Sequence, residues 1–141
     1  MTAPGTHHEL CFGCGQANLF GLHLELDSVD ADALAGRFFL KQDHQGPDGS
    51  AHPGIIGAAL EEAIAHLSDH GDAGAAPGAP ARVEIDYRGR APVGSYVRLR
   101  AWLERDPAGG VMGHAVALTG DRDDTVAEAR AFRFSDGPRG E

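Results

Sequence analysis

The sequence has few of the residues that mark several large protein classes. It contains only two cysteines among 141 residues, too few for a disulfide-stabilised scaffold. It has no apolar run long enough to cross a membrane and no apolar core of a secretory signal, so we expect a cytoplasmic protein with no membrane partner. Twelve basic residues stand against 21 acidic ones, and the net charge of −9 argues against a nucleic-acid partner.

The basic residues that are present are unevenly distributed. Half of them lie within residues 82–105. A local basic strip on an acidic protein suits an anionic small molecule, for instance one with phosphates. Solvated arginines on exposed strand faces explain the strip equally well. These six residues are Arg82, Arg88, Arg90, Arg98, Arg100 and Arg105.

The segment of residues 52–67 (HPGIIGAALEEAIAHL) predicts a long apolar helix. Pro53 suits the first helical position, and His52 or Ser50 can cap the N-terminus. Gly71 can end the helix after about residue 69 or 70. At 100° per residue, five side chains form one stripe that requires a core. They are Ile56, Leu60, Ala63, Ile64 and Leu67.

The two glutamates of this helix lie on different faces. Glu61 shares its face with small residues such as Gly57, Ala58 and Ala65. A lone carboxylate on such a face is partly desolvated and suits acid/base chemistry, although a carboxylate bonded to a neighbouring chain is the structural alternative. Glu62 lies about 100° further round on a polar face, so we expect an ordinary solvated or salt-linked residue.

Alternating apolar and polar residues predict six strands, two before the helix and four after it. A helix followed by a meander predicts an α+β fold, an antiparallel sheet with the helix on one face. We expect a single domain over residues 1–141, with flexible ends at 1–10 and 135–141. The predicted strands are residues 21–26, 33–40, 82–87, 96–103, 111–118 and 126–134.

The two cysteines, Cys11 and Cys14, allow three interpretations. A zinc site needs four ligands, and His7, His8 and His23 could supply the others, but the spacing matches no zinc finger. A redox pair should follow a strand and open a helix, which the next residues do not clearly continue. A structural turn with buried thiols is the favoured interpretation, so we expect no metal ligand among the site residues.

The order of elements resembles the hot-dog fold, in which an antiparallel β-sheet wraps around one long central helix. The sequence resembles acyl-CoA thioesterases of the phenylacetate-pathway type. Their helix opens with His-Gly-Gly and carries Asp or Glu nine residues after the histidine, the spacing of His52 and Glu61. Residues 11–15 (CFGCG), 43–47 (DHQGP) and 87–94 also resemble segments of this family.

This resemblance implies hydrolysis of an acyl thioester carried on coenzyme A or on an acyl-carrier protein. Glu61 would be the general base or the nucleophile, and the helix start from His52 to Gly54 would bind the carbonyl oxygen. Gln45 could position water or the acyl group. No cofactor is expected beyond the coenzyme A or phosphopantetheine of the substrate. The expected substrate-binding residues are Pro53, Gly46, Arg82, Arg88 and Arg90.

One departure from the family concerns the residue after the histidine. The family has a glycine there, whose N–H polarises the thioester carbonyl, whereas Pro53 has no N–H. The N–H of Gly54 could substitute for it. Alternatively, the protein could catalyse dehydration, isomerisation or cyclisation of a tethered acyl chain, or bind acyl groups without catalysis.

The spacing on the helix also bears on oligomerisation. Gly54 and Glu61 are seven residues apart, roughly 10 Å along the helix axis, so both cannot contact one carbonyl group. If both are catalytic, they come from different chains related by a two-fold axis. We therefore expect a homodimer or a dimer-of-dimers tetramer, as the resemblance also implies.

Overall fold

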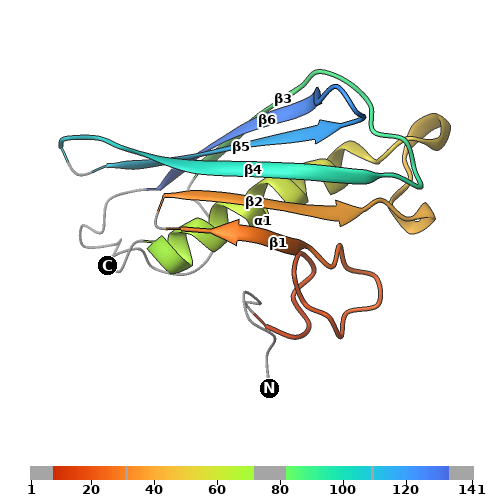
Figure 1. The fold of residues 1–141 in the computed structure, drawn as a ribbon, viewed down its shortest axis with the longest axis horizontal. Helices are drawn as coiled ribbons and strands as arrows, with labels where there is room; N and C mark the ends of the chain where they lie inside the picture. The colour runs from red at the N-terminus through yellow and green to blue at the C-terminus, as the bar shows by residue number, and fades with distance from the viewer. Residues whose placement is uncertain (1–7, 31, 72–81, 109, 134–141) are drawn as a thin grey trace.

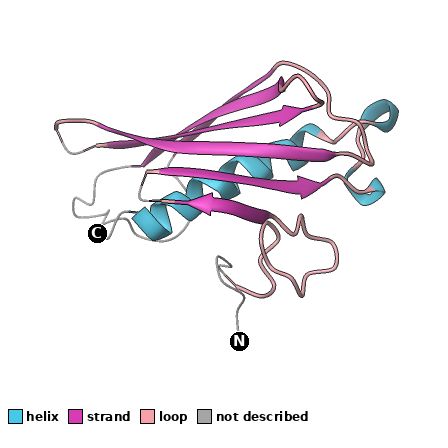
Figure 2. Ribbon diagram, in the orientation of Figure 1, coloured by secondary structure: helices cyan, strands magenta, loops and turns pink. Residues whose placement is uncertain are grey.

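The computed structural model describes residues 8–30, 32–71, 82–108 and 110–133. One long helix, α1 (Pro53–Gly71), lies along one face of a six-stranded antiparallel sheet, as Figures 1 and 2 show. The strand order is β1-β2-β4-β5-β6-β3, which leaves β1 and β3 at the two edges. The strands are β1 (Glu25–Val29), β2 (Ala33–Phe39), β3 (Arg82–Tyr87), β4 (Tyr96–Arg105), β5 (Val111–Thr119) and β6 (Asp124–Arg133).

This arrangement confirms the α+β class and the hot-dog architecture expected from the sequence. The predicted apolar stripe of α1 faces the sheet, and all five of its side chains are at most 3% exposed. Among the helices that the structure describes, none combines the length and apolar character needed to cross a membrane.

Small residues on the inner face of the sheet let α1 approach closely. A Cβ at Gly113 of β5 would collide with Ile64 of α1. Close packing of this kind leaves no room for a larger side chain without moving the helix. The other small residues buried on β5 and β6 are Ala115, Ala117, Ala127, Ala129 and Ala131.

The first strand differs from its prediction. Residues 21–26 alternate as a strand should, but β1 begins only at Glu25. The N–H groups of Leu22 and Leu24 donate instead to the carbonyls of Phe12 and Gly13, at 2.8 and 2.9 Å. His23 between them has a positive φ of 53°, which strand residues do not adopt. The alternation therefore reports burial of Leu22 and Leu24 beneath a loop rather than a place in the sheet.

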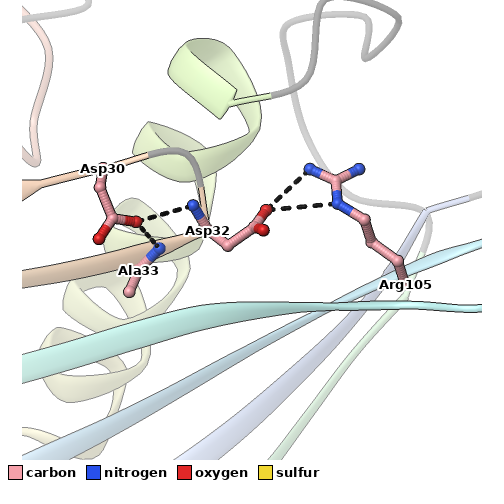
Figure 3. A network of polar contacts seen from close by, with 4 residues as sticks. All are labelled: Asp30, Asp32, Ala33 and Arg105. Atoms are coloured by element: carbon pink, nitrogen blue, oxygen red, sulfur yellow. Dashed lines mark hydrogen bonds and ion pairs between the residues drawn. The ribbon is translucent and has the colours of Figure 1, made fainter.

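The later elements match their predictions to within about two residues at each end. Asp30 and Asp32, between β1 and β2, belong to a network of polar contacts (Figure 3). The Asp30 carboxylate accepts the N–H groups of Asp32 and Ala33, at 2.9 and 2.8 Å, and Asp32 accepts two hydrogen bonds from Arg105 of β4. Residues 72–81 between α1 and β3, residue 134 and most of the expected flexible ends lie outside the described residues.

Candidate functional site

The start of α1 is capped by the side chain of His52. The Nδ1 atom of His52 accepts the N–H of Gly54 at 2.9 Å, and the His52 carbonyl accepts the N–H of Ile55 at 2.9 Å. Pro53 lies between them and has no N–H. The N–H of Gly54, expected to replace the missing donor, is thus already donated to His52. His52, Pro53 and Gly54 are all exposed, so a ligand can reach the helix start.

This hydrogen bond determines which nitrogen of the neutral His52 ring carries the proton. An Nδ1 atom that accepts an N–H must be unprotonated, so the proton of the neutral imidazole lies on Nε2. Within the described residues, Nε2 has no hydrogen-bond partner. The helix start therefore presents one side-chain N–H donor in place of the absent backbone donor.

The loop 41–52 folds tightly against His52. It contains two 3₁₀ turns, Gln42–His44 and Pro47–Gly49, and the N–H of Gly46 donates to the Ser50 carbonyl at 2.7 Å. A Cβ at Gly46 would lie 2.7 Å from the Cα of His52, so only glycine fits there. Gln45 is exposed in the same loop. Two predicted site residues, Gln45 and Gly46, thus belong to the same loop as His52.

A buried histidine that the sequence analysis did not select holds this loop. His44 is 2% exposed, its Nδ1 accepts the Lys41 N–H at 3.2 Å, and its carbonyl accepts the His52 N–H at 2.9 Å. Burial lowers the pKa of the His44 imidazole below its usual value of 6.5, and the positive charge of Lys41 lowers this pKa further. The ring is therefore neutral at pH 7, and it positions the residue that caps α1.

Acid is expected to destabilise the protein through His44. Because the His44 pKa is lowered on folding, the unfolded chain binds the proton more tightly. The stability that the neutral ring confers is present above about pH 6.5 and is lost as the pH falls through the lowered folded-state pKa. The melting temperature should therefore fall between about pH 7.5 and pH 5.5, and less so in His44→Asn, whose side-chain oxygen can replace Nδ1 as acceptor. An equal fall in both proteins would contradict this assignment.

The carboxylate of Glu61 lies on a half-buried, largely apolar face of α1. Its helix neighbours Ala58 and Ala65 are half-buried, as is Glu61 itself. Within the described residues, the Glu61 carboxylate has no hydrogen-bond or ion-pair partner. Gly54 of the same helix lies about 10 Å away along the axis, so the helix start of the same chain is out of reach.

Strand β3 runs beside this face and reaches the helix start. The Tyr87 hydroxyl donates to the Pro53 carbonyl at 2.9 Å. A Cβ at Gly57 would lie 3.0 Å from Ile85 and 3.1 Å from the Tyr87 hydroxyl, so glycine permits this contact. Arg90, just beyond β3, lies 3.8 Å from the carboxylate of Asp48 in the loop 41–52. Arg90 is therefore close to the helix start.

The other two arginines expected to bind substrate are exposed, Arg82 at the start of β3 and Arg88 just after its end. Arg88 pairs with Glu128 at 2.8 Å, and Arg82 pairs with Glu84 at 2.6 Å. Exposed pairs of this kind contribute about 0–1 kcal/mol, so either arginine can exchange its partner for a phosphate. Arg82 lies five residues before Tyr87, roughly 16 Å along the strand, and is therefore not part of the same cluster.

A second group of side chains surrounds Glu62. Of the two states predicted for it, solvated or salt-linked, the structure has the second, with His66 as the partner. Glu62 is not solvated, because its side chain is only 12% exposed. Its carboxylate lies 3.0 Å from Nε2 of the fully buried His66, and the Cys11 Sγ atom lies 3.7 and 3.8 Å from its two oxygens. Cys14 is 2% exposed beside it, in a turn, as the favoured interpretation of the cysteines expects. In the sequence, the residue that could have indicated this contact is Gly13, because a Cβ there would collide with Glu62.

No protein-family model matches the sequence, and no curated protein sequence matches it either. Solved structures do match the fold. The PaaI protein of the Escherichia coli phenylacetic acid degradation operon has a TM-score of 0.67 and 16% identity, covering 78% of this chain and 81% of that chain. A putative thioesterase from Ralstonia eutropha, described as a phenylacetic acid degradation-related protein, has a TM-score of 0.68 and 24% identity over 78% and 83%.

A third similar structure holds a ligand. It is a Streptococcus mutans protein bound to acetyl CoA, with a TM-score of 0.70 and 14% identity, covering 83% of this chain and 91% of that chain. Identities this low establish the fold alone. The chain therefore has the hot-dog fold, which it shares with PaaI and with proteins of the thioesterase superfamily.

Proposed function

We propose that this protein hydrolyses an acyl thioester carried on coenzyme A or on an acyl-carrier protein. The observation that carries the proposal is Glu61, a half-buried carboxylate without a partner among the described residues, on a helix whose exposed start can hold a carbonyl oxygen. The fold is shared with a protein that binds acetyl CoA, which supports a thioester as the ligand.

The proposed active site is formed by two chains. Glu61 of one chain faces the helix start of its partner, because the two groups on one helix are about 10 Å apart. The assembly is a homodimer or a dimer of such dimers, with the half-buried face around Ala58 and Glu61 at the interface. An interface there explains why α1 leaves small residues on the side that the sheet does not cover.

In the proposed reaction, Glu61 removes a proton from water as the water oxygen bonds to the thioester carbon. The negative charge that develops on the carbonyl oxygen is stabilised by the Nε2–H of His52 and by the dipole of α1. The C–S bond then breaks, and the thiolate leaves and takes up the proton. If Glu61 instead attacks the thioester carbon, the thiolate leaves and an anhydride forms; water that then attacks the Glu61 carbonyl of this anhydride leaves heavy oxygen from labelled water in the Glu61 side chain.

The remaining site residues would hold the substrate. Gln45 would position the water or the acyl group, and Gly46 and Pro53 would contact the substrate beside Gln45. Arg90 and Arg88 would bind the phosphates of coenzyme A. Arg82 lies further along β3 and would meet substrate only across the subunit interface. No cofactor takes part beyond the carrier of the acyl group.

Release of free thiol from a panel of acyl-CoA thioesters tests this function directly. The panel should include straight-chain, aromatic and hydroxylated acyl groups, because the sequence does not identify the acyl group. Thiol release above the uncatalysed rate for at least one substrate supports hydrolysis. Tight binding of acyl-CoA with no thiol release and no change in substrate mass indicates an acyl-binding protein.

A second candidate keeps the fold and changes the reaction. Pro53 supplies no N–H, and the Gly54 N–H is already donated to His52. Dehydration, isomerisation or cyclisation of a tethered acyl chain needs the Glu61 base more than it needs a strong oxyanion donor. In that case, mass spectrometry would show a changed acyl group on an intact thioester.

Two substitutions of His52 separate its two contacts. His52→Ala removes both the cap on Gly54 and the proposed donor, and hydrolysis should fall by about 10²–10³-fold. His52→Asn retains a good N-cap and loses the Nε2–H, so its melting temperature should match that of the wild type while hydrolysis stays low. If His52→Asn restores hydrolysis, His52 serves only as a cap.

A further inference from the structure

We propose that Cys11, Cys14 and Glu62 form a zinc site that joins the N-terminal loop to the middle of α1. Their Sγ atoms and a carboxylate oxygen all lie within 4.8 Å of one another. Cys11 and Cys14 are three residues apart, whereas Glu62 comes from a helix about 50 residues later in the chain. This site goes beyond the proposed thioester hydrolysis and takes no part in that reaction.

The distance from the Cys11 sulfur to the Glu62 carboxylate, which also permits a thiol hydrogen bond, matches the spacing of two ligands on one metal ion. Zinc–sulfur bonds are about 2.3 Å and zinc–oxygen bonds about 2.0–2.2 Å, so neighbouring ligands of a tetrahedral site lie roughly 3.5–3.8 Å apart. The Cys11 Sγ atom lies 3.7 Å from Oε1 and 3.8 Å from Oε2 of Glu62. Because the two distances are nearly equal, the carboxylate faces the sulfur with both oxygens. The two sulfurs and one carboxylate oxygen supply three of the four ligands of a tetrahedral zinc site, and a water molecule would complete it.

The chemistry of this set of ligands selects zinc. Thiolates favour zinc over magnesium or calcium, and a carboxylate is an accepted zinc ligand. Two thiolates and one carboxylate carry three negative charges, which a divalent cation reduces to one. Binding releases one proton from each thiol as each Zn–S bond forms, so the affinity for zinc rises with pH.

The loop of residues 8–18 is already folded around this position. The N–H of Gly15 donates to the Cys11 carbonyl at 2.8 Å, and the N–H of Ala17 donates to the Glu9 carbonyl at 2.9 Å. Gly13 has no side chain, and the Glu62 carboxylate lies where its Cβ would be. A loop held in this way loses little conformational entropy when the ion binds.

His66 would support the carboxylate ligand from behind. It lies one turn after Glu62 on α1, its side chain is fully buried, and its Nε2 is 3.0 Å from the Oε2 of Glu62. A polar group this close to a metal ligand orients it and tunes its affinity. His8 and His23, considered above as zinc ligands, make other contacts: His8 accepts the Leu10 N–H, and His23 bonds to the Asn18 carbonyl.

Metal analysis of the full chain tests the site without an activity assay. Protein reduced, treated with a chelator and then dialysed against zinc chloride should hold about one zinc ion per chain. Cys11→Ser, Cys14→Ser and Glu62→Gln should each bind zinc at least about tenfold more weakly. Glu61→Gln changes the adjacent carboxylate in the same way and should keep its zinc. If the protein binds zinc but releases no thiol from any acyl-CoA, only the proposed function fails. If it releases thiol but binds no zinc, only the zinc site fails.

Cobalt offers a readout on the unmodified protein, in case a substitution prevents folding. Cobalt chloride added to the metal-free protein should produce a thiolate-to-metal charge-transfer band and the strong visible bands of a four-coordinate site. Saturating zinc should raise the melting temperature by about 5–10 °C over the chelated protein. The proposal is overturned if zinc stays well below one ion per chain after reloading and no charge-transfer band appears. Recovery of a Cys11–Cys14 disulfide under reducing conditions would also overturn it.

Discussion

Glu61→Gln is expected to lower the rate of thioester hydrolysis by about 10²–10⁴-fold, the usual contribution of a general base. The substitution keeps the size and hydrogen-bonding capacity of the side chain and removes only its ability to take a proton. Because Glu61 has no partner within the described residues, stability should change little. Free-thiol release under saturating substrate measures kcat, and calorimetric titration with a non-hydrolysable acyl-CoA analogue measures binding, which should be retained.

A matched control is available on the sheet. Among the described residues, the exposed Glu104 of β4 bonds only to His114, at 2.8 Å, so Glu104→Gln removes a charge on the exposed face of the strand, opposite its buried face. Its hydrolysis rate should equal that of the wild type. If Glu61→Gln lowers the rate less than about tenfold but weakens the dimer in sedimentation analysis, the carboxylate is an interface residue rather than a base.

The helix of this fold was predictable because its signals are local. Pro53 begins α1, the periodic apolar residues identify its buried face, and both features depend only on neighbours within two turns. The meander predicted after the helix holds only for β4, β5 and β6, because β3 pairs with β6 at the sheet edge instead of with β4. The position of Glu61 on a face of small residues was equally visible, since helical spacing alone determines it.

The errors in the sequence analysis arise where distant segments meet. Helical spacing placed Glu62 on a polar face, but the N-terminal loop covers that face, where Glu62 is only 12% exposed and His66 is fully buried. Carbonyl groups of the same loop accept the backbone N–H groups of Leu22 and Leu24, so β1 begins only at Glu25. No local pattern encodes contacts across 40 or 50 residues of sequence. In residues 11–15, only Gly13 indicates such a contact, because the absence of its side chain leaves room for the Glu62 carboxylate.

The hydrogen bond between His52 and Gly54 also could not be predicted from a residue pattern. A histidine before Pro53 could cap the helix or bind substrate, and both roles have the same sequence. The structure shows the cap, and it is compatible with the proposed donor, because a neutral ring that caps through Nδ1 carries its proton on Nε2. Pro53, which lacks a backbone N–H, thus lies between His52, the proposed side-chain donor, and Gly54, whose N–H fixes the tautomer of the His52 ring.

Mixing two inactive variants should restore activity if the active site is shared between chains. A dimer of one Glu61→Gln chain and one His52→Ala chain has one site with both substitutions and one site with neither. Random pairing makes half of the dimers mixed, so activity should recover to about a quarter of the wild-type value, from about 1% or less in either variant alone.

Co-expression of the two variants with different affinity tags allows the mixed dimer to be purified and assayed for thiol release. The purified mixed dimer should reach about half of the wild-type activity per chain, because one of its two sites is intact. A mixed dimer with no more activity than its parents would place Glu61 and His52 in separate or single-chain sites. Because Glu61 lies nine residues after His52, roughly 13 Å along the helix axis, such a result would leave Glu61 without a carbonyl to act on and remove the basis for thioester hydrolysis.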